Sequence, residues 1–117
     1  MNKEKSKIFF DKAKKMMPGG VNSPVRAFIS VNDNPFFVKR AKGAYIYDVD
    51  GNSYLDYVAS WGAIILGHAD SGLIKEVIDA LENGTSFGAC HPNEIELAKL
   101  ITEAFPSIEL LRLTSSG

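Results

Sequence analysis

Cysteine is scarce in this 117-residue chain, in which Cys90 is the only one. No internal disulfide can form, and we expect a cytoplasmic protein in which the thiol stays reduced. Long hydrophobic runs are also missing: the apolar run 63–66 stops at Gly67, far short of the roughly 20 residues that span a membrane. The polar start at residues 1–5 precedes no apolar signal segment, so a membrane protein is not expected.

Acidic residues are sparse in the first part of the chain, and basic residues are sparse in the remainder. Residues 1–42 contain ten Lys and Arg against three Asp and Glu, whereas residues 43–117 contain three against eleven. Six of the lysines alternate with apolar residues before position 17, a pattern typical of the solvated face of an amphipathic helix. No aromatic and basic recognition motif accompanies them, so no nucleic-acid partner is expected. The composition, 45% hydrophobic and 23% charged, predicts one globular domain with a core.

The segment from Pro18 to Arg26 is the most specified part of the chain. Its two prolines remove backbone donors and its paired glycines allow backbone conformations closed to other residues, so we expect a defined loop rather than a helix or strand. The loop presents Ser23 and Arg26, a hydroxyl and a planar guanidinium. A guanidinium binds a carboxylate or phosphate through two parallel hydrogen bonds, so the loop predicts a site for a small anion.

Periodicity predicts a helix over residues 4–17 and then a small antiparallel sheet. The expected strands cover residues 36–40, 44–49 and 53–57, with a tight turn at Asp50-Gly51. Residues 59–70 have no regular period and are expected to form an irregular connector. The tyrosines of the sheet suit cross-strand packing, Asp50 suits the turn, and Asp48 and Asp56 suit the polar face of the sheet.

Two further helices and one strand are predicted after the connector. Asp70 or Ser71 caps the first helix, which stops at Asn83-Gly84, and the second runs from near Asn93 to Pro106. A buried strand is expected at 110–113. It leads into Ser115-Ser116-Gly117, which opens a turn of the kind that cradles phosphate before a helix. No helix follows within this sequence, so we expect it to be cut inside that motif.

Read in order, several motifs resemble those of the glutamate-1-semialdehyde 2,1-aminomutase family, which is related to the class III (ω-) aminotransferases. The motifs are Met17–Phe28 (MPGGVNSPVRAF), Tyr47–Gly51 (YDVDG), Ser60–Gly62 (SWG), Leu66–His68 (LGH), Gly84–Gly88 (GTSFG) and Ser115–Gly117 (SSG). The first and the fifth are peculiar to the aminomutase, whereas YDVDG and Gly67-His68 are shared across class III. The chain departs from the family pattern at residues 70–72, where a proline is usual, and at Ser115, where asparagine is usual.

The resemblance implies an α/β protein, a fold-type I enzyme that depends on pyridoxal 5'-phosphate and pyridoxamine 5'-phosphate, of which this chain is the N-terminal part. Residues 1–64 would form the N-terminal segment and small-domain sheet, and residues 65–117 the start of the large cofactor-binding domain. The complete enzyme would be a homodimer that converts glutamate 1-semialdehyde to 5-aminolevulinate for tetrapyrrole synthesis. The lysine that forms the Schiff base lies downstream in the family, so this chain alone is expected to be inactive.

The resemblance also implies roles for particular residues. Arg26 and Ser23 would bind the substrate carboxylate, Trp61 would lie near the cofactor ring and substrate, and Ser116 and Gly117 would contact the cofactor phosphate. We expect a structural hydrogen bond for His68. Cys90-His91 has no recognisable metal-ligand spacing and receives no role.

Two other functions fit the sequence. The first is an ω-aminotransferase of the same fold, which transfers the amino group between two substrates. The second is a stand-alone small α/β binding domain without catalysis, a function supported only by the short length.

Overall fold

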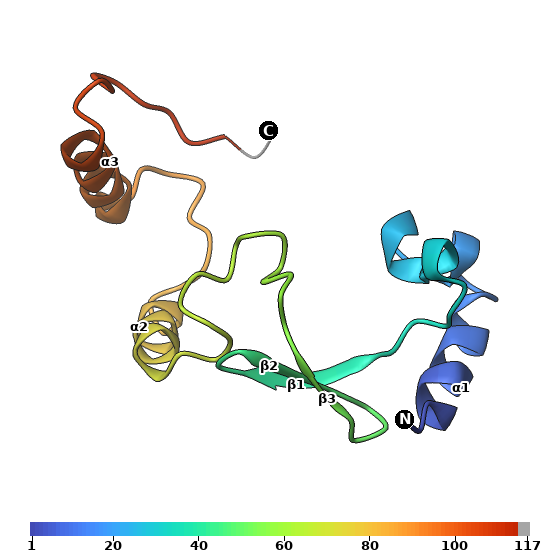
Figure 1. The fold of residues 1–117 in the computed structure, drawn as a ribbon. Coiled ribbons are helices and arrows are strands. Elements are labelled where there is room, and N and C mark those ends of the chain that lie inside the picture. Colours follow the sequence, from blue (N-terminus) through green and yellow to red (C-terminus); the bar gives the residue numbers. More distant parts are fainter. Residues whose placement is uncertain (115–117) are drawn as a thin grey trace. The chain divides into compact units, whose positions relative to one another are not determined.

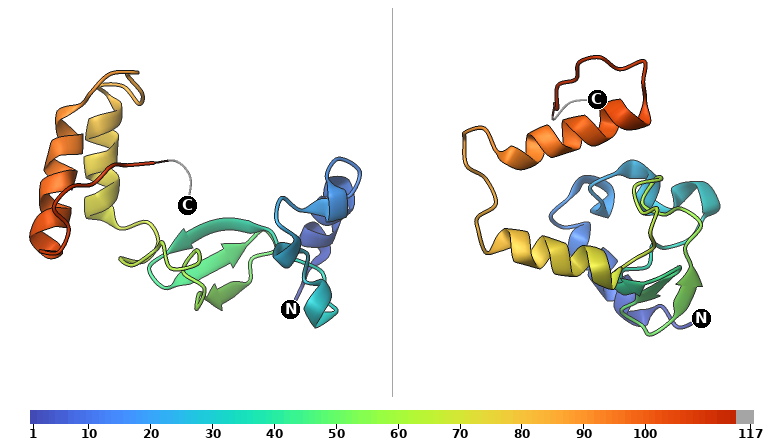
Figure 2. Two further views of the ribbon diagram at one scale, coloured as in Figure 1. Left: turned by 90° about the horizontal axis from the view of Figure 1, so that it is seen from above. Right: turned by 90° about the vertical axis from the view of Figure 1, so that its left-hand side faces the viewer.

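A computed structural model describes residues 1–114, which fall into two compact units, Met1–Glu76 and a second that begins at Val77. The first unit contains α1 (Glu4–Ala13), three 3₁₀ turns, and the strands β1 (Val38–Lys42), β2 (Tyr45–Asp48) and β3 (Ser53–Leu55). Within it, α1 and the 3₁₀ turns lie together at one end of the sheet (Figures 1 and 2). No helix among residues 1–114 is long and apolar enough to cross a membrane.

Helix α1 ends earlier than the expected residue 17. After Ala13 the backbone bonds tighten, as Lys15 N–H donates to Lys12 and Met16 N–H donates to Ala13. Met17 is extended, at φ −133° and ψ 137°, because the ring of Pro18 disfavours the helical conformation in the residue before it. Pro18 therefore accounts for the extended residue directly before it, whereas the helix has already ended at Ala13.

The loop from Pro18 to Arg26 is partly helical, which corrects the prediction of a loop without helix. It contains the 3₁₀ turns η1 (Pro18–Gly20) and η2 (Pro24–Ala27), and η3 (Ile29–Val31) follows. Both prolines stand at the first position of a turn, where their missing N–H costs nothing and their fixed φ suits the turn. The expectation of a defined conformation is confirmed.

The predicted antiparallel sheet is confirmed, with strand order β1-β2-β3. Lys42 pairs with Tyr45 across a two-residue turn, and an irregularity between Val38 and Arg40 shifts the register of β1. In the next pair, Tyr47 lies opposite Ser53 and Ile46 opposite Tyr54. Cross-strand packing of tyrosine is confirmed at Tyr47, whose ring lies 3.5 Å from the Arg40 guanidinium carbon on the neighbouring strand.

The sequence predicts Asp48 on the polar face of the sheet, and this prediction is wrong. Asp48 is buried and only 2% exposed. Its carboxylate accepts hydrogen bonds from the Asp50 and Asn52 backbone N–H groups, at 3.0 and 2.7 Å, and from the Asn52 side chain and the Tyr54 hydroxyl, at 2.7 and 2.9 Å. Burial, the largest effect, raises the pKa of Asp48, but these hydrogen bonds together outweigh it and the pKa lies below its ordinary value.

The turn between β2 and β3 also holds the first helix. Asp50 accepts hydrogen bonds from the backbone N–H groups of Lys5 and Ser6, at 2.7 and 2.9 Å, and from the Ser6 hydroxyl at 2.6 Å. The residue at the N-cap, Lys3, makes no capping bond with its side chain. The Asn2 side chain accepts the Glu4 N–H at 3.0 Å, and a carboxylate from the hairpin accepts the next two N–H groups of the helix.

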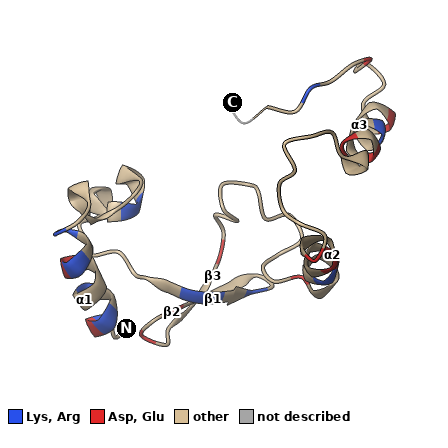
Figure 3. Ribbon diagram, turned by 180° about the vertical axis from the view of Figure 1, so that it is seen from behind, with Lys and Arg blue, Asp and Glu red and all other residues tan. Residues whose placement is uncertain are grey.

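Helix α2 (Ser71–Leu81) and helix α3 (Pro92–Ala104) match the two predicted helices. Asp70 begins α2 by accepting a hydrogen bond from the Leu73 N–H at 2.9 Å, as predicted. The charge asymmetry is also visible, with Lys and Arg on α1 and β1 and mainly Asp and Glu on α2 and α3 (Figure 3).

The strand predicted at 110–113 is wrong: these residues have neither helical nor strand structure. A buried strand of this kind needs neighbours that accept and donate its backbone hydrogen bonds, and within residues 1–114 no strand pairs with it. The apolar run alone therefore cannot determine its conformation.

The prediction of a core is also wrong for the part of the chain that the structure describes. Ala13 and Ala27, each 5% exposed, are its buried aliphatic residues, and the larger side chains on the apolar face of α2, such as Leu73, Val77 and Leu81, remain about half exposed. Composition predicts how much apolar surface a chain carries, but burial requires a second layer to cover it.

We predict that Asp48→Asn destabilises the first unit by about 1–3 kcal/mol, because the amide N–H₂ of asparagine would face two donors, the Asn52 side chain and the Tyr54 hydroxyl. Exchange of the Asp50 and Asn52 amides with deuterium should speed up. The pKa of Asp48 in the folded protein lies below its ordinary value of 3.8, so ionised Asp48 stabilises the fold above pH 3.8, and this stabilisation is lost as the pH falls below that value. The Asp48→Asn variant should lack this loss of stability in acid.

The exposed ion pair of Lys3 and Asp33 supplies the control. Asp33→Asn should leave the exchange rates of the amides in the β2–β3 turn unchanged at neutral pH. Equal exchange in the wild type and in Asp48→Asn would contradict the structural role given to Asp48.

We predict that Gly20→Ala is more damaging than Gly19→Ala. Both glycines have positive φ, 72° and 66°, so either substitution costs about 1 kcal/mol. A Cβ at Gly20 would lie 2.7 Å from Phe10 Cε2, whereas one at Gly19 would lie 3.9 Å from its nearest neighbour. The clash should add about 1–3 kcal/mol, measurable as a lower midpoint of urea unfolding. Equal midpoints for the two variants would show that Gly20 does not pack on α1 as described.

Candidate functional site

A groove of about 610 Å³ lies within the first unit, and we call it the Arg26–Trp61 groove after the two side chains that define its character. Its apolar lining includes Phe36, Val38 and Ile46, from the chain entering the sheet and from the sheet itself. Arg26 lines it from η2, and Trp61 from the irregular connector. Two of the residues selected from sequence are therefore brought to one hollow.

Arg26 is the cation among the lining residues of this groove. It is exposed, and within residues 1–114 its guanidinium has no hydrogen-bond or ion-pair partner. Its backbone N–H donates to the Ser23 carbonyl at 2.9 Å, which closes the turn that carries it. An unpaired guanidinium above an apolar surface can bind an anionic group through two hydrogen bonds.

Aromatic stacking supports the floor of the groove. The Phe36 ring stacks on Tyr54 with centroids 4.5 Å apart, and Phe28 meets Phe36 edge to face at 5.6 Å. Phe28 is left-handed, at φ 58°, which ends η2 and turns its ring back toward the sheet. Because Tyr54 also bonds the buried Asp48, the floor is tied to the turn between β2 and β3.

Trp61 is 71% exposed, so it is not the core residue that a large apolar side chain usually becomes. It lies in a left-handed turn in which Ala59, Ser60 and Trp61 have φ values of 47°, 52° and 62°. For residues other than glycine this conformation costs roughly 1–2 kcal/mol each. The backbone at Trp61 is therefore strained, and strain of this kind persists only where the surroundings impose it.

Asp56 and His68 also line the groove, and the two are paired. His68 Nε2 lies 2.7 Å from Asp56 Oδ2, which confirms the structural hydrogen bond predicted for the histidine. Asp56 lies just after β3 and turns toward the connector, a correction to its predicted place on the polar face of the sheet. The bond with His68, followed by those from the Ala59 and Val58 N–H groups, holds the pKa of Asp56 below its ordinary value.

The pairing of Asp56 with His68 could not be predicted from the sequence. The two residues are separated by twelve positions with no regular period between them, so spacing contains no signal. A pair of hydrogen bonds between the Gly43 and His68 backbones, at 2.7 and 2.8 Å, brings the histidine back to the first hairpin turn. A Cβ on Gly67 would lie 3.1 Å from the Gly43 carbonyl oxygen, so the glycine permits this approach.

Ser23 is half-buried and is not among the lining residues of the groove. Its carbonyl supports Arg26, and its side chain makes no capping bond at η2. Ser116 and Gly117, the residues predicted to bind phosphate, lie outside the residues that the structure describes.

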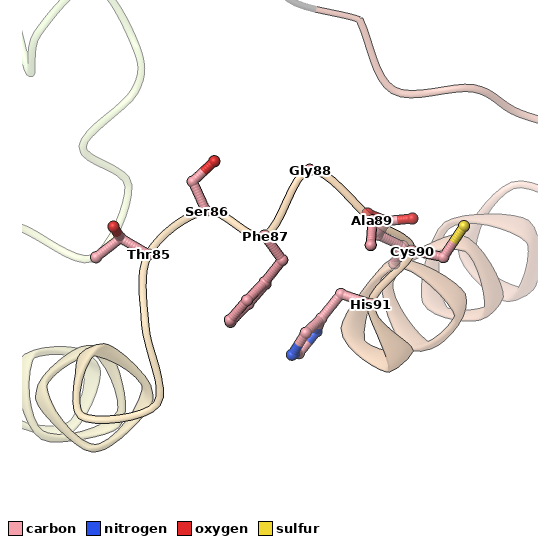
Figure 4. Close-up of a pocket in the computed structure, with 8 residues that line it drawn as sticks. Thr85, Ser86, Phe87, Gly88, Ala89, Cys90 and His91 are labelled. Carbon is pink, nitrogen blue, oxygen red and sulfur yellow. The ribbon is translucent and has the colours of Figure 1, made fainter.

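A second hollow, of about 660 Å³, lies in the loop between α2 and α3 (Figure 4). The Phe87 and His91 rings stack face to face with centroids 5.2 Å apart, and His91 Nδ1 accepts a hydrogen bond from the Asn93 N–H, which caps α3. Cys90 is exposed, and no group of three residues able to hold a metal ion occurs within residues 1–114. The hydrogen bond at the start of α3 gives His91 a structural role.

Comparison with protein-family models matches residues 28–117 to "Aminotransferase class-III". Two similar proteins named glutamate-1-semialdehyde 2,1-aminomutase come from Bacillus licheniformis, at 58% identity over 97% of this chain and 26% of that protein, and from Thermodesulfovibrio yellowstonii, at 57% over 100% and 27%. The chain thus spans about a quarter of the length of these relatives.

Solved structures are similar as well. An omega-transaminase from Sphaerobacter thermophilus has a TM-score of 0.86 at 37% identity, covering 96% of this chain and 25% of the other. A glutamate-1-semialdehyde-aminomutase from Pseudomonas aeruginosa has a TM-score of 0.76 at 17% identity over 87% of this chain and 22% of the other, which shows the shared fold alone. Because the family model covers most of the sequence, this chain belongs to the class-III aminotransferase family.

Proposed function

We propose that the complete protein is a glutamate-1-semialdehyde 2,1-aminomutase, a homodimer of the cytoplasm that produces 5-aminolevulinate for tetrapyrrole synthesis. The observation that carries this proposal is the identity of 53–58% with proteins of that name over nearly all of this chain. The Arg26–Trp61 groove supports it, because it offers one free cation and one exposed aromatic ring above an apolar surface. Glutamate 1-semialdehyde carries one carboxylate, which matches the cation.

The groove also fits a pyridoxal or pyridoxamine phosphate ring. Its lining is largely apolar, and Trp61 presents an exposed indole suited to contact with a flat aromatic ring. Solved relatives include a "Transaminase with PLP bound", and it is 34% identical to this chain. When bound, such a cofactor supplies the electron sink that amino transfer between adjacent carbons needs.

Arg26 is proposed to hold the carboxylate of the substrate. Its turn is closed by the Ser23 carbonyl and bounded by Pro24, so the backbone under the side chain is constrained before binding. A charge-assisted pair of hydrogen bonds contributes on the order of 1.5–3 kcal/mol. This grip would keep the substrate in place between the two halves of the amino transfer.

The remaining site residues have supporting parts. Ser23 lies outside the lining of the groove and is proposed to assist Arg26 in binding the carboxylate through the turn that its carbonyl closes. Trp61 is proposed to border the cofactor ring, and Ser116 with Gly117 to contact the phosphate. Backbone N–H groups at a turn that opens a helix are suited to such an anion.

A second candidate function is supported by the solved relatives. The omega-transaminase from Sphaerobacter thermophilus and a beta-phenylalanine aminotransferase from Variovorax paradoxus are 37% and 34% identical to this chain. An ω-aminotransferase needs an external amino acceptor, whereas an aminomutase does not. Turnover of glutamate 1-semialdehyde by the complete protein without any added acceptor would decide for the aminomutase, and a strict requirement for an acceptor would decide for the transaminase.

We predict that Arg26→Ala lowers kcat/KM for glutamate 1-semialdehyde by about 10–150-fold, mainly through a higher KM. Arg26→Lys should recover only part of the loss, because an ammonium keeps the charge but cannot form the paired bonds. Steady-state kinetics of the complete protein provide the measurement.

Arg40 is the matched control for this substitution, since it stacks on Tyr47 and does not line the groove. Arg40→Ala should leave kcat/KM within about twofold. An unchanged KM in Arg26→Ala would argue against a carboxylate grip at this residue.

We also predict that the 117-residue chain expressed alone forms no 5-aminolevulinate and retains no cofactor absorbance after dialysis. The physical reason is its span of about a quarter of its relatives and the few side chains it buries. Persistent absorbance together with product formation would overturn the proposal that it is one part of the active enzyme.

A further inference from the structure

The connector after β3 contains a complete left-handed turn built mostly from residues that disfavour one. Ala59, Ser60 and Trp61 have positive φ and Gly62 follows at φ 91°. Two backbone hydrogen bonds close the turn. The Trp61 N–H donates to the Val58 carbonyl at 2.9 Å, and the Ile64 N–H donates to the Ala59 carbonyl at 3.0 Å. Three consecutive left-handed residues with side chains form only where other contacts hold them.

Asp56 supplies that hold from the N-terminal side of the turn. Its Oδ1 accepts hydrogen bonds from the Val58 N–H at 2.9 Å and from the Ala59 N–H at 3.1 Å. These two N–H groups stand where the chain enters the turn, so one carboxylate oxygen directs the backbone as it changes hand. The other oxygen, Oδ2, is left for His68 at 2.7 Å.

His68 anchors the carboxylate to the sheet. Its backbone exchanges two hydrogen bonds with Gly43, at 2.7 and 2.8 Å, in the turn between β1 and β2. The Asp56 and His68 side chains are only 10% and 20% exposed, so the pair is shielded from competing water. A continuous series of bonds therefore runs from the first hairpin turn through His68 and Asp56 to the residue before Ser60.

These hydrogen bonds determine where the Trp61 ring lies. Trp61 ends the strained part of the turn, remains 71% exposed, and lines the same groove as Arg26. An ordinary right-handed turn would direct its side chain elsewhere, because the hand of the backbone sets the direction of the Cα–Cβ bond.

We propose that Asp56 and His68 are positioning residues that hold the left-handed turn at 59–61 and thereby aim Trp61 into the ligand groove. The ligand identity rests on the proposed function, but the placement of the ring does not. Neither residue takes part in the chemistry: Asp56 acts on two backbone N–H groups, and His68 acts on Asp56.

The test uses the complete protein labelled with 5-fluorotryptophan, with the Trp61 resonance assigned by its loss in Trp61→Phe. Asp56→Ala should shift or broaden this ¹⁹F resonance and lower kcat/KM by about 10–100-fold. Asp56→Asn and His68→Gln, which preserve size, should give smaller changes in the same direction and serve if the alanine variant does not fold. Asp11→Asn, which breaks exposed ion pairs on α1, should leave the resonance and the kinetics unchanged.

Rescue by glycine separates positioning from chemistry. Adding Ala59→Gly to Asp56→Asn removes the penalty for a left-handed residue, and should restore the Trp61 resonance toward wild type and recover about fivefold in kcat/KM. Glycine cannot replace a proton-transferring carboxylate, so a role in acid–base chemistry would show no rescue. Absence of rescue in both readouts overturns the proposal.

The two readouts also keep this proposal distinct from the proposed function. A Trp61 resonance that responds to Asp56 and His68 in a protein without aminomutase activity would uphold the positioning role and reject the function. Aminomutase activity together with a Trp61 resonance that ignores both substitutions would uphold the function and reject the positioning role.

Discussion

Two carboxylates, one at the end of β2 and one in the turn that follows it, are the constraint on which the first unit depends. Asp48 collects the donors of its own turn and the Tyr54 hydroxyl, and Asp50 caps α1 through Lys5 and Ser6. Ser6 is fully buried and its hydroxyl also accepts a hydrogen bond from the Phe37 N–H. With few buried apolar side chains, this unit relies on charge-assisted hydrogen bonds to hold the start of its helix to the turn between β2 and β3.

The groove inherits its shape from that constraint. Helix α1 packs against η1, and η1 against η2, so fixing the helix also fixes the turn that carries Arg26. On the other wall, the Asp56–His68 pair and the Gly43 bridge hold the connector that carries Trp61. Arg26 and Trp61, which are 35 positions apart in sequence, therefore line one groove. Each is held in place by its own wall.

Much of the architecture was predictable from local sequence. The antiparallel sheet, the turn at Asp50-Gly51, the cap at Asp70 and both later helices follow from alternation, turn residues and helix periodicity, all of which act over a few residues. The conformation of residues 110–113 was not predictable, because pairing partners rather than apolar character decide whether such a run becomes a strand. The core was not predictable either, since burial depends on what covers each face.

For the site, the sequence by itself determined that Arg26 sits in a constrained turn and that Trp61 lies in irregular chain, because proline and glycine restrict or free the backbone locally. Only the tertiary structure decided that the two line one groove, that Ser23 does not, and that Asp56 pairs with His68. It also decided that Asp48 is buried rather than on a polar face. The physical reason is that hydrogen bonds between residues distant in sequence depend on how the hairpins fold back, which no local pattern records.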